Sequence, residues 1–166
     1  MVIDGHSNDR TIDVAKSCGA EIICQEGKGK GDAIAQAIPW MDKSIKFVVL
    51  IDADYTYPAE FVPQMIEVLE AYPDVGMVCG NRLFGSRDKE ALHSRFYLGN
   101  RMLAIAHGFL NDVQLEDPLT GLRVVRAQVF RDWKVKSNSF DIEVELNAQV
   151  KKQGYETVEV PIKYRP

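Results

Sequence analysis

A run of apolar residues that ends abruptly in two aspartates constrains this chain more than any other feature. The run Phe47–Ile51, with three β-branched members, is followed at once by Asp52-Ala53-Asp54. Such a run is typical of a strand buried on both faces inside a parallel sheet. A strand of this kind delivers the residues after it to the carboxyl edge of the sheet, where open α/β folds bind ligands. The run therefore predicts an α/β domain with both aspartates at its ligand-binding edge.

Two carboxylates one residue apart repel each other unless a positive charge lies nearby. Mg²⁺ prefers one or two carboxylates together with phosphate oxygens. Asp52 and Asp54 therefore predict a divalent cation that carries the phosphates of a nucleotide. The alternative is a turn at the end of the strand, in which the aspartates only cap the following helix.

The rest of the chain alternates between strand-like and helix-like segments. This alternation predicts one three-layer α/β/α domain over residues 1–166, with a mostly parallel sheet. The expected strands are 2–3, 21–25, 47–51, 75–80, 120–125 and 157–160, and the expected helices are 11–17, 32–38, 59–72, 89–110, 127–132 and 142–153.

Composition excludes several classes of partner and location. The formal net charge is −4, so the chain lacks the basic excess of a nucleic-acid-binding protein. No apolar stretch approaches the ~20 residues of a membrane-spanning helix. Cys24 and Cys79 lie within expected strands, where we expect buried, unreactive thiols. These features predict a cytoplasmic protein in a reducing setting, with no nucleic acid as partner.

Two further polar residues follow expected strands. Asp4 is placed to accept hydrogen bonds from a ribose or a base, or else it forms a turn with Gly5. Arg82 follows the strand that we expect beside 47–51, and its guanidinium suits the oxygens of a diphosphate. The alternative for Arg82 is a surface ion pair with Asp88 or Glu90.

Three other segments are candidates with a plain structural alternative. The loop Gly27–Gly31 lacks the phosphate-loop pattern and is by default a solvated basic loop, although it is compatible with anion binding. Asp117 lies in a loop, and Glu143 lies near a helix start, where an acid favours the helix dipole. The expected helix 89–110 has an apolar face edged by bases, which suits either an anionic membrane surface or the sheet.

In this order, the segments resemble the family 2 glycosyltransferases of the GT-A fold, and among them the polyprenyl-phosphate (dolichyl-phosphate) mannosyl- and glucosyltransferase branch. The resemblance spans nearly the whole chain, and the ordered set carries it rather than any single piece. The matching pieces are Val2–Thr11, Gly29–Ala33, Asp52–Pro58, Gly80–Arg82, Asp117–Gly121, Phe140–Glu143 and Val160–Ile162.

The resemblance implies a nucleotide-sugar donor, of the GDP-mannose or UDP-glucose type, held at the residues that match the family's motifs. Asp4 and the backbone near Val2 would contact the nucleoside. Asp52-Ala53-Asp54 corresponds to the family's Asp-x-Asp motif, in which the two catalytic aspartates hold Mg²⁺ or Mn²⁺ and the diphosphate. Arg82 would assist at the donor phosphates.

The same resemblance implies a lipid phosphate as acceptor. A polyprenyl phosphate is already an anionic nucleophile, so little general-base help is needed, and we expect inversion by direct displacement. Asp117 and Glu143 are candidates for the acceptor or sugar side. We expect peripheral contact with the cytoplasmic membrane face through residues 89–110.

The chain also departs from the family pattern. Thr56 stands where several relatives place a Gln that helps to hold the metal. The family's usual first strand and its carboxyl-terminal extension are expected to be missing from residues 1–166. Two alternatives therefore remain: transfer to a soluble or glycan acceptor, and a non-catalytic nucleotide-binding module.

Overall fold

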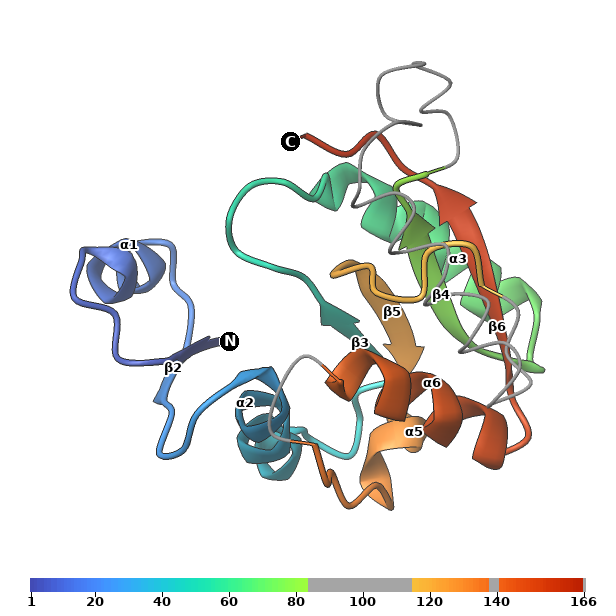
Figure 1. Cartoon of the computed structure of the whole chain (residues 1–166), viewed down its shortest axis with the longest axis horizontal. Helices are drawn as coiled ribbons and strands as arrows, with labels where there is room; N and C mark the ends of the chain where they lie inside the picture. Colours follow the sequence, from blue (N-terminus) through green and yellow to red (C-terminus); the bar gives the residue numbers. More distant parts are fainter. Residues whose placement is uncertain (84–114, 138–140, 166) are drawn as a thin grey trace.

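The computed structural model describes residues 1–83, 115–137 and 141–165, and its strands form two sheets within these ranges (Figure 1). The smaller sheet pairs β1 with β2 in parallel, and the larger has the strand order β3-β5-β4-β6. The strands are β1 (Val2–Asp4), β2 (Ile22–Cys24), β3 (Phe47–Leu50), β4 (Val75–Asn81), β5 (Arg123–Arg126) and β6 (Glu156–Pro161).

The larger sheet is mixed rather than mostly parallel, because one strand opposes the other three. β5 is antiparallel to both β3 and β4, and β4 is parallel to β6. β3, β4 and β6 therefore run in the same direction. Since β5 lies between β3 and β4, the expectation that Arg82 leaves the strand next to 47–51 is wrong.

β3 is an edge strand of the larger sheet, and the expectation that it is buried on both faces is wrong. Val49 is 37% exposed, and Ile51, just beyond the strand, is 41% exposed. Among the described residues β3 pairs only with β5, so its side chains lack neighbours along one edge. Every residue of β4, which is flanked on both sides, is buried.

The expected helices occur close to their predicted positions. The α-helices are α1 (Thr11–Ser17), α2 (Lys30–Ala37), α3 (Val62–Ala71), α5 (Ala127–Arg131) and α6 (Ile142–Lys152), and the 3-10 turns are η1 (Ile38–Trp40) and η2 (Ala59–Phe61). Pro63 lies in the first turn of α3, where a missing N–H costs nothing. The expected helix 89–110 lies outside the described residues. None of the helices within the described ranges is long and apolar enough to cross a bilayer.

Helices cover both faces of the larger sheet, which confirms the three-layer arrangement (Figure 1). On β4, Met77 and Cys79 pack in a cluster with residues of α2, α5 and α6. Val78, which points the other way, packs in a second cluster with Met65 and Leu69 of α3. The alternation along β4 therefore builds two cores, one on each face.

The two strand cysteines differ. Cys79 is fully buried, and burial raises the pKa of its thiol to about 11. Cys24, expected to be buried, is exposed. Its strand β2 pairs only with β1 among the described residues, so this sheet is too narrow to enclose it.

Candidate active site

Asp52 is held in an ion-paired cluster that also contains Lys30 and Glu143. Nζ of Lys30 lies 2.8 Å from Oδ1 of Asp52 and 2.8 Å from Oε1 of Glu143. Lys30 is the first residue of α2, and Glu143 lies in the first turn of α6. The side chain of Asp52 is 38% exposed, while that of Glu143 is only 8% exposed. The cluster therefore reaches from the protein interior to the open end of β3.

The loop before α2 is folded so that Lys30 starts the helix. Gly29 has a φ of +84°, which a residue with a side chain rarely adopts. The side-chain amide of Gln25 donates to the Gly29 carbonyl at 2.7 Å and to Asp32 at 2.9 Å. Gly27 donates its N–H to the same carboxylate of Asp32 at 3.2 Å. These bonds make 27–31 an ordered turn rather than the solvated loop taken as the default.

Asp54 lies in an exposed turn that its own carboxylate closes. Oδ1 of Asp54 accepts bonds from the N–H of Thr56 at 3.1 Å and from its hydroxyl at 2.5 Å. These bonds to the charged form lower the pKa of Asp54. Tyr55 between them is 78% exposed and has a φ of +66°, so the turn holds a strained residue. The Thr56 hydroxyl is thus bonded to Asp54.

Asp52 and Asp54 fit a divalent cation that takes its remaining ligands from phosphate. Within the described residues no group of three or more His, Cys, Asp or Glu side chains could enclose a metal. Oδ2 of each aspartate accepts no hydrogen bond from the described part of the chain. Two hard oxygen ligands with open valences are what Mg²⁺ bound to a diphosphate requires. The donor set therefore suits Mg²⁺ or Mn²⁺ only together with a nucleotide.

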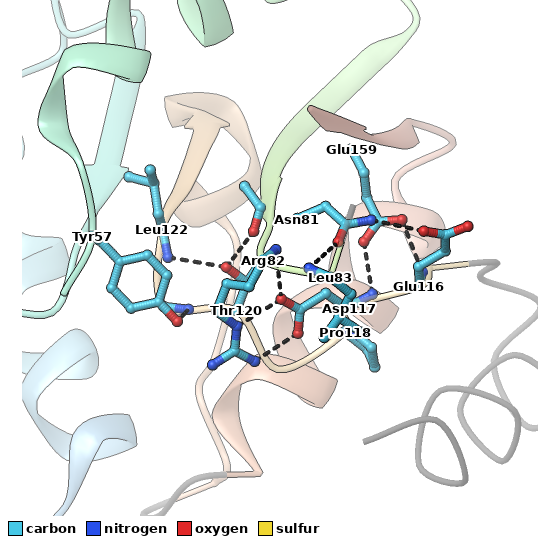
Figure 2. Close-up of polar contacts among 12 residues, drawn as sticks. Tyr57, Asn81, Arg82, Leu83, Glu116, Asp117, Pro118, Thr120, Leu122 and Glu159 are labelled. Atoms are coloured by element: carbon cyan, nitrogen blue, oxygen red, sulfur yellow. Dashed lines mark hydrogen bonds and ion pairs between the residues drawn. The ribbon is translucent and has the colours of Figure 1, made fainter. Parts of the chain in front are cut away.

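Arg82 and Asp117 form a second, tighter cluster at the end of β4 (Figure 2). Nε and Nη2 of Arg82 donate to Oδ2 and Oδ1 of Asp117 at 2.7 and 2.6 Å, and the Arg82 N–H donates to Oδ2 at 3.1 Å. Asp117 has no exposed surface. This bidentate pair raises the pKa of Arg82 despite its burial. Two of the nitrogens that could face a diphosphate are therefore bonded to Asp117.

The segment that carries Asp117 is anchored on both neighbouring strands (Figure 2). Glu159 of β6 accepts the N–H groups of Glu116 and Asp117, each at 2.8 Å. The Thr120 hydroxyl donates to the Gly80 carbonyl of β4 at 2.6 Å. These bonds fix the segment at the ends of β4 and β6, and the expected role of Asp117 at the acceptor or sugar side stays a prediction.

Tyr57 and Gly121 connect the two clusters. The N–H of Gly121 donates to the Tyr57 hydroxyl at 2.7 Å, and burial raises the pKa of this phenol. A Cβ on Gly121 would lie 2.0 Å from Oδ2 of Asp52 and 2.8 Å from the Tyr57 ring. The Arg82 guanidinium lies 6.0 Å from the centre of the same Tyr57 ring. Gly121 therefore allows the segment 115–122 to approach Asp52.

The remaining predicted site residues lie elsewhere or are not tested. Asp4 ends β1 in the smaller sheet, and its carboxylate accepts the Ser7 N–H at 3.0 Å. Hydrogen bonds from Ser7 lower the pKa of Asp4. Val2 begins the same strand. Between the described residues no bond joins Asp4 to Asp52, and the role of Asp4 at the nucleoside stays a prediction. Phe140, residues 89–110 and the alternative partners of Arg82 at 88 and 90 lie outside the described ranges.

Sequence analysis missed the contacts of Lys30, Tyr57, Gly121 and Glu159. Lys30 had a local signal, a Gly-Lys-Gly segment before a helix, which we interpreted by default as solvated. Tyr57 belongs to the segment that follows the two aspartates, so its place near them could be predicted. Its hydrogen-bond partner could not. The bond from Gly121 to Tyr57 spans 64 positions. No local pattern predicts such a contact.

Comparison with known proteins gives one family and several relatives. Residues 1–133 match the family described as Glycosyl transferase family 2. The chain is 33% identical to glycosyltransferase AglJ of Haloferax volcanii over all of this chain and 54% of that protein. It is 33% identical to a dolichyl-phosphate hexose transferase of the same organism, over 99% of this chain and 69% of that protein.

A solved structure supports the fold. Glucosyl-3-phosphoglycerate synthase of Mycobacterium tuberculosis, in complex with Mn²⁺, uridine diphosphate and glucosyl-3-phosphoglycerate, matches with a TM-score of 0.71 and 21% identity, over 99% of this chain and 60% of that one. At this identity the match shows the fold alone, and it confirms the expected GT-A fold. This chain thus spans about half to two thirds of the length of the proteins that it resembles.

Proposed function

Because the chain belongs to glycosyl transferase family 2, we propose that it transfers a hexose from a nucleotide sugar to a polyprenyl phosphate. Asp52 and Asp54 would hold a divalent cation and, through it, the donor diphosphate. One observation carries this proposal: the loop after β3 holds two carboxylates whose Oδ2 atoms accept no hydrogen bond from the described residues. Such a pair suits a cation shared with phosphate oxygens.

The chain's own residues would divide the work at the donor. A bound Mg²⁺ or Mn²⁺ supplies charge stabilisation for the leaving nucleoside diphosphate. Asp52 and Asp54 would position it, and the hydrogen bonds from Thr56 stabilise the charged form of Asp54. Asp4 and the backbone at Val2 remain our candidates for the nucleoside, and Ala53 lines the phosphate position. The presence of uridine diphosphate and Mn²⁺ in the structural neighbour is consistent with this division.

The bonding of the remaining acids favours an acceptor that needs no general base. Asp117 is ion-paired with Arg82 and Glu143 with Lys30, so we assign neither of them as a general base. A phosphate acceptor is already anionic and can attack the anomeric carbon directly, which inverts its configuration. The relative named as a dolichyl-phosphate hexose transferase supports a lipid phosphate in this role. Contact with the cytoplasmic membrane face through residues 89–110 is part of the same proposal.

The test is a transfer assay with radiolabelled GDP-mannose and UDP-glucose, run with polyprenyl phosphate and with a soluble phosphate acceptor. We expect label in the lipid phase, Mn²⁺- or Mg²⁺-dependent, and lost in Asp52→Asn. Asp42→Asn is a matched control, because Asp42 closes a similar exposed turn through the N–H of Ser44 at 2.7 Å. Label found only in the soluble acceptor would show that the acceptor is not a lipid phosphate and would overturn that part of the proposal. Metal-dependent nucleotide binding with neither transfer nor donor hydrolysis would favour a non-catalytic binding module.

A further inference from the structure

Lys30 is bonded to Oδ1 of Asp52, on the same carboxylate whose Oδ2 we propose as a cation ligand. Its Nζ is shared between Oδ1 of Asp52 and Oε1 of Glu143, at 2.8 Å from each. We propose that Lys30 is a positioning residue: it neutralises Asp52 until the nucleoside diphosphate brings its divalent cation, and Glu143 then retains the displaced ammonium. This inference rests on the proposed function, because it requires Asp52 to be a cation ligand.

The two contacts of Lys30 differ in how easily they can be exchanged. Asp52 is 38% exposed, so water screens its pair with Lys30 and the contact is replaceable. Glu143 is 8% exposed, and leaving this buried carboxylate without a partner would be costly. The contact with Asp52 is therefore the one that a cation breaks, and the contact with Glu143 is the one that stays.

Glu143 also has an unused oxygen for the displaced ammonium. Its Oε2 is the one buried side-chain polar atom, in the described part of the chain, that has no hydrogen-bond partner. A cavity of about 10 Å³ lies beside the cluster, and its lining includes Lys30, Glu143 and Leu50. A group the size of a water molecule needs roughly 10–15 Å³. The ammonium can thus turn from Asp52 toward Oε2 without leaving the cluster, and the turn supplies the missing partner.

This exchange makes cation binding depend on the nucleotide. With the protein alone, a divalent cation at Asp52 is repelled by the ammonium of Lys30, which lies 2.8 Å from Oδ1, and it gains only two carboxylates. With a nucleoside diphosphate present, phosphate oxygens add ligands and offset this repulsion. Removing the charge of Lys30 should therefore strengthen binding of the cation alone and reduce the gain that the nucleotide provides.

The experiment is a Mn²⁺ titration followed by electron paramagnetic resonance, first without nucleotide and then with GDP or UDP. Lys30→Met is compared with Lys28→Met, which removes the same charge from an exposed lysine of the same loop. We expect Lys30→Met to bind Mn²⁺ alone roughly fivefold more tightly than the wild type, and Lys28→Met to remain close to it. Lys30→Gln also removes the charge but keeps hydrogen-bond donors, and it should behave as Lys30→Met does. It allows the test to be made if Lys30→Met does not fold.

The outcomes separate this inference from the proposed function. If the wild type binds Mn²⁺ with a nucleotide and both Lys30 variants match Lys28→Met, the role of Lys30 is wrong while the cation site stands. If the wild type binds no Mn²⁺ with either nucleotide, the cation site is wrong and the inference falls with it. Tighter binding of Mn²⁺ alone in both Lys30 variants, with a smaller nucleotide effect, supports the inference.

Discussion

The loops after β3 and β4 both carry aspartates, but their carboxylates are bonded to very different degrees. After β3, Asp52 and Asp54 are partly exposed, and each has one oxygen without a bond from the described residues. After β4, Arg82 meets Asp117, which is fully buried and accepts three hydrogen bonds from that one residue. The carboxylates of the first loop retain oxygens without hydrogen bonds, whereas the carboxylate of the second loop is bonded to Arg82.

This difference separates acids that can do chemistry from acids that maintain structure. A buried bidentate pair is costly to break and offers little to a substrate. An exposed aspartate with one partner contributes little to stability and remains able to bind a cation. Sequence motifs assigned both loops to the substrate, whereas the bonding assigns them different roles.

The strongest test of this contrast is Asp52→Asn or Asp54→Asn. Losing a charged ligand for the cation should reduce transfer by roughly a thousandfold, or about 4 kcal/mol in the activation free energy. Stability in urea should change by less than about 1 kcal/mol, since both side chains are exposed or weakly paired. A variant that unfolds while the residual folded protein keeps full turnover would reverse the roles of the two loops.

Asp117→Asn should produce the opposite pattern, a large loss of stability. It leaves the partly buried Arg82 guanidinium without a counter-charge, which typically costs about 3 kcal/mol. Urea unfolding measures the loss. Glu60→Gln is the control, because it breaks the exposed pair with Arg165 and should cost less than about 1 kcal/mol. Equal losses in the two variants would show that burial of the Asp117 pair is unimportant.

Gly121→Ala tests the connection between the loops. A Cβ there would lie 2.0 Å from Oδ2 of Asp52, so the carboxylate or the segment must move. A displacement of about 1 Å at a catalytic group can cost roughly a hundredfold in rate. Gly19→Ala is a useful control, because Gly19 has a φ of +75° but open space around it, and it should lose stability without losing transfer. Full transfer activity in Gly121→Ala would mean that this close approach does not position Asp52.

The smallest expected effect is a difference in pH dependence. Burial raises the pKa of Glu159 above 4.5, although backbone N–H bonds oppose the shift. Its folded form binds a proton more tightly than its unfolded form, so its contribution to stability grows as the pH falls through the raised pKa. The pKa of Asp54 is lowered, so its contribution is present above pH 3.8 and is lost as the pH falls further.

Glu159→Gln should therefore flatten the stability profile just above pH 4.5, while Asp54→Asn should change it only below pH 3.8. Thermal unfolding across this pH range measures both. A profile for Glu159→Gln that keeps the wild-type slope would contradict the assignment of Glu159.

The positions of the helices and strands could be predicted because their signals are local. The helical spacing of apolar residues in 62–71 indicates α3, and Gly154, with a φ of +81°, follows α6. The order of the strands could not be predicted. Nothing in 123–126 indicates that β5 lies antiparallel between β3 and β4, because strand pairing is decided between segments far apart in the chain.

The candidate site divides in the same way. The aspartates after β3 were visible because an apolar strand ends in two carboxylates. The partners were not, because the contact of Lys30 with Asp52 spans 22 positions and that of Arg82 with Asp117 spans 35. The burial that distinguishes Asp117 from Asp52 depends on the whole sheet and its helices. Sequence motifs therefore located the acids, and only the packing showed how each of them is bonded and buried.

The most direct test of the central claim is a calorimetric titration of the chain with GDP and with UDP, in the presence of Mn²⁺ and then of a chelator. We predict that one nucleotide binds with Mn²⁺, that chelation abolishes the binding, and that Asp52→Asn does not bind although it remains folded. Binding that survives chelation, or that is unchanged in Asp52→Asn, would contradict the assignment of the loop after β3 as the cation and diphosphate site.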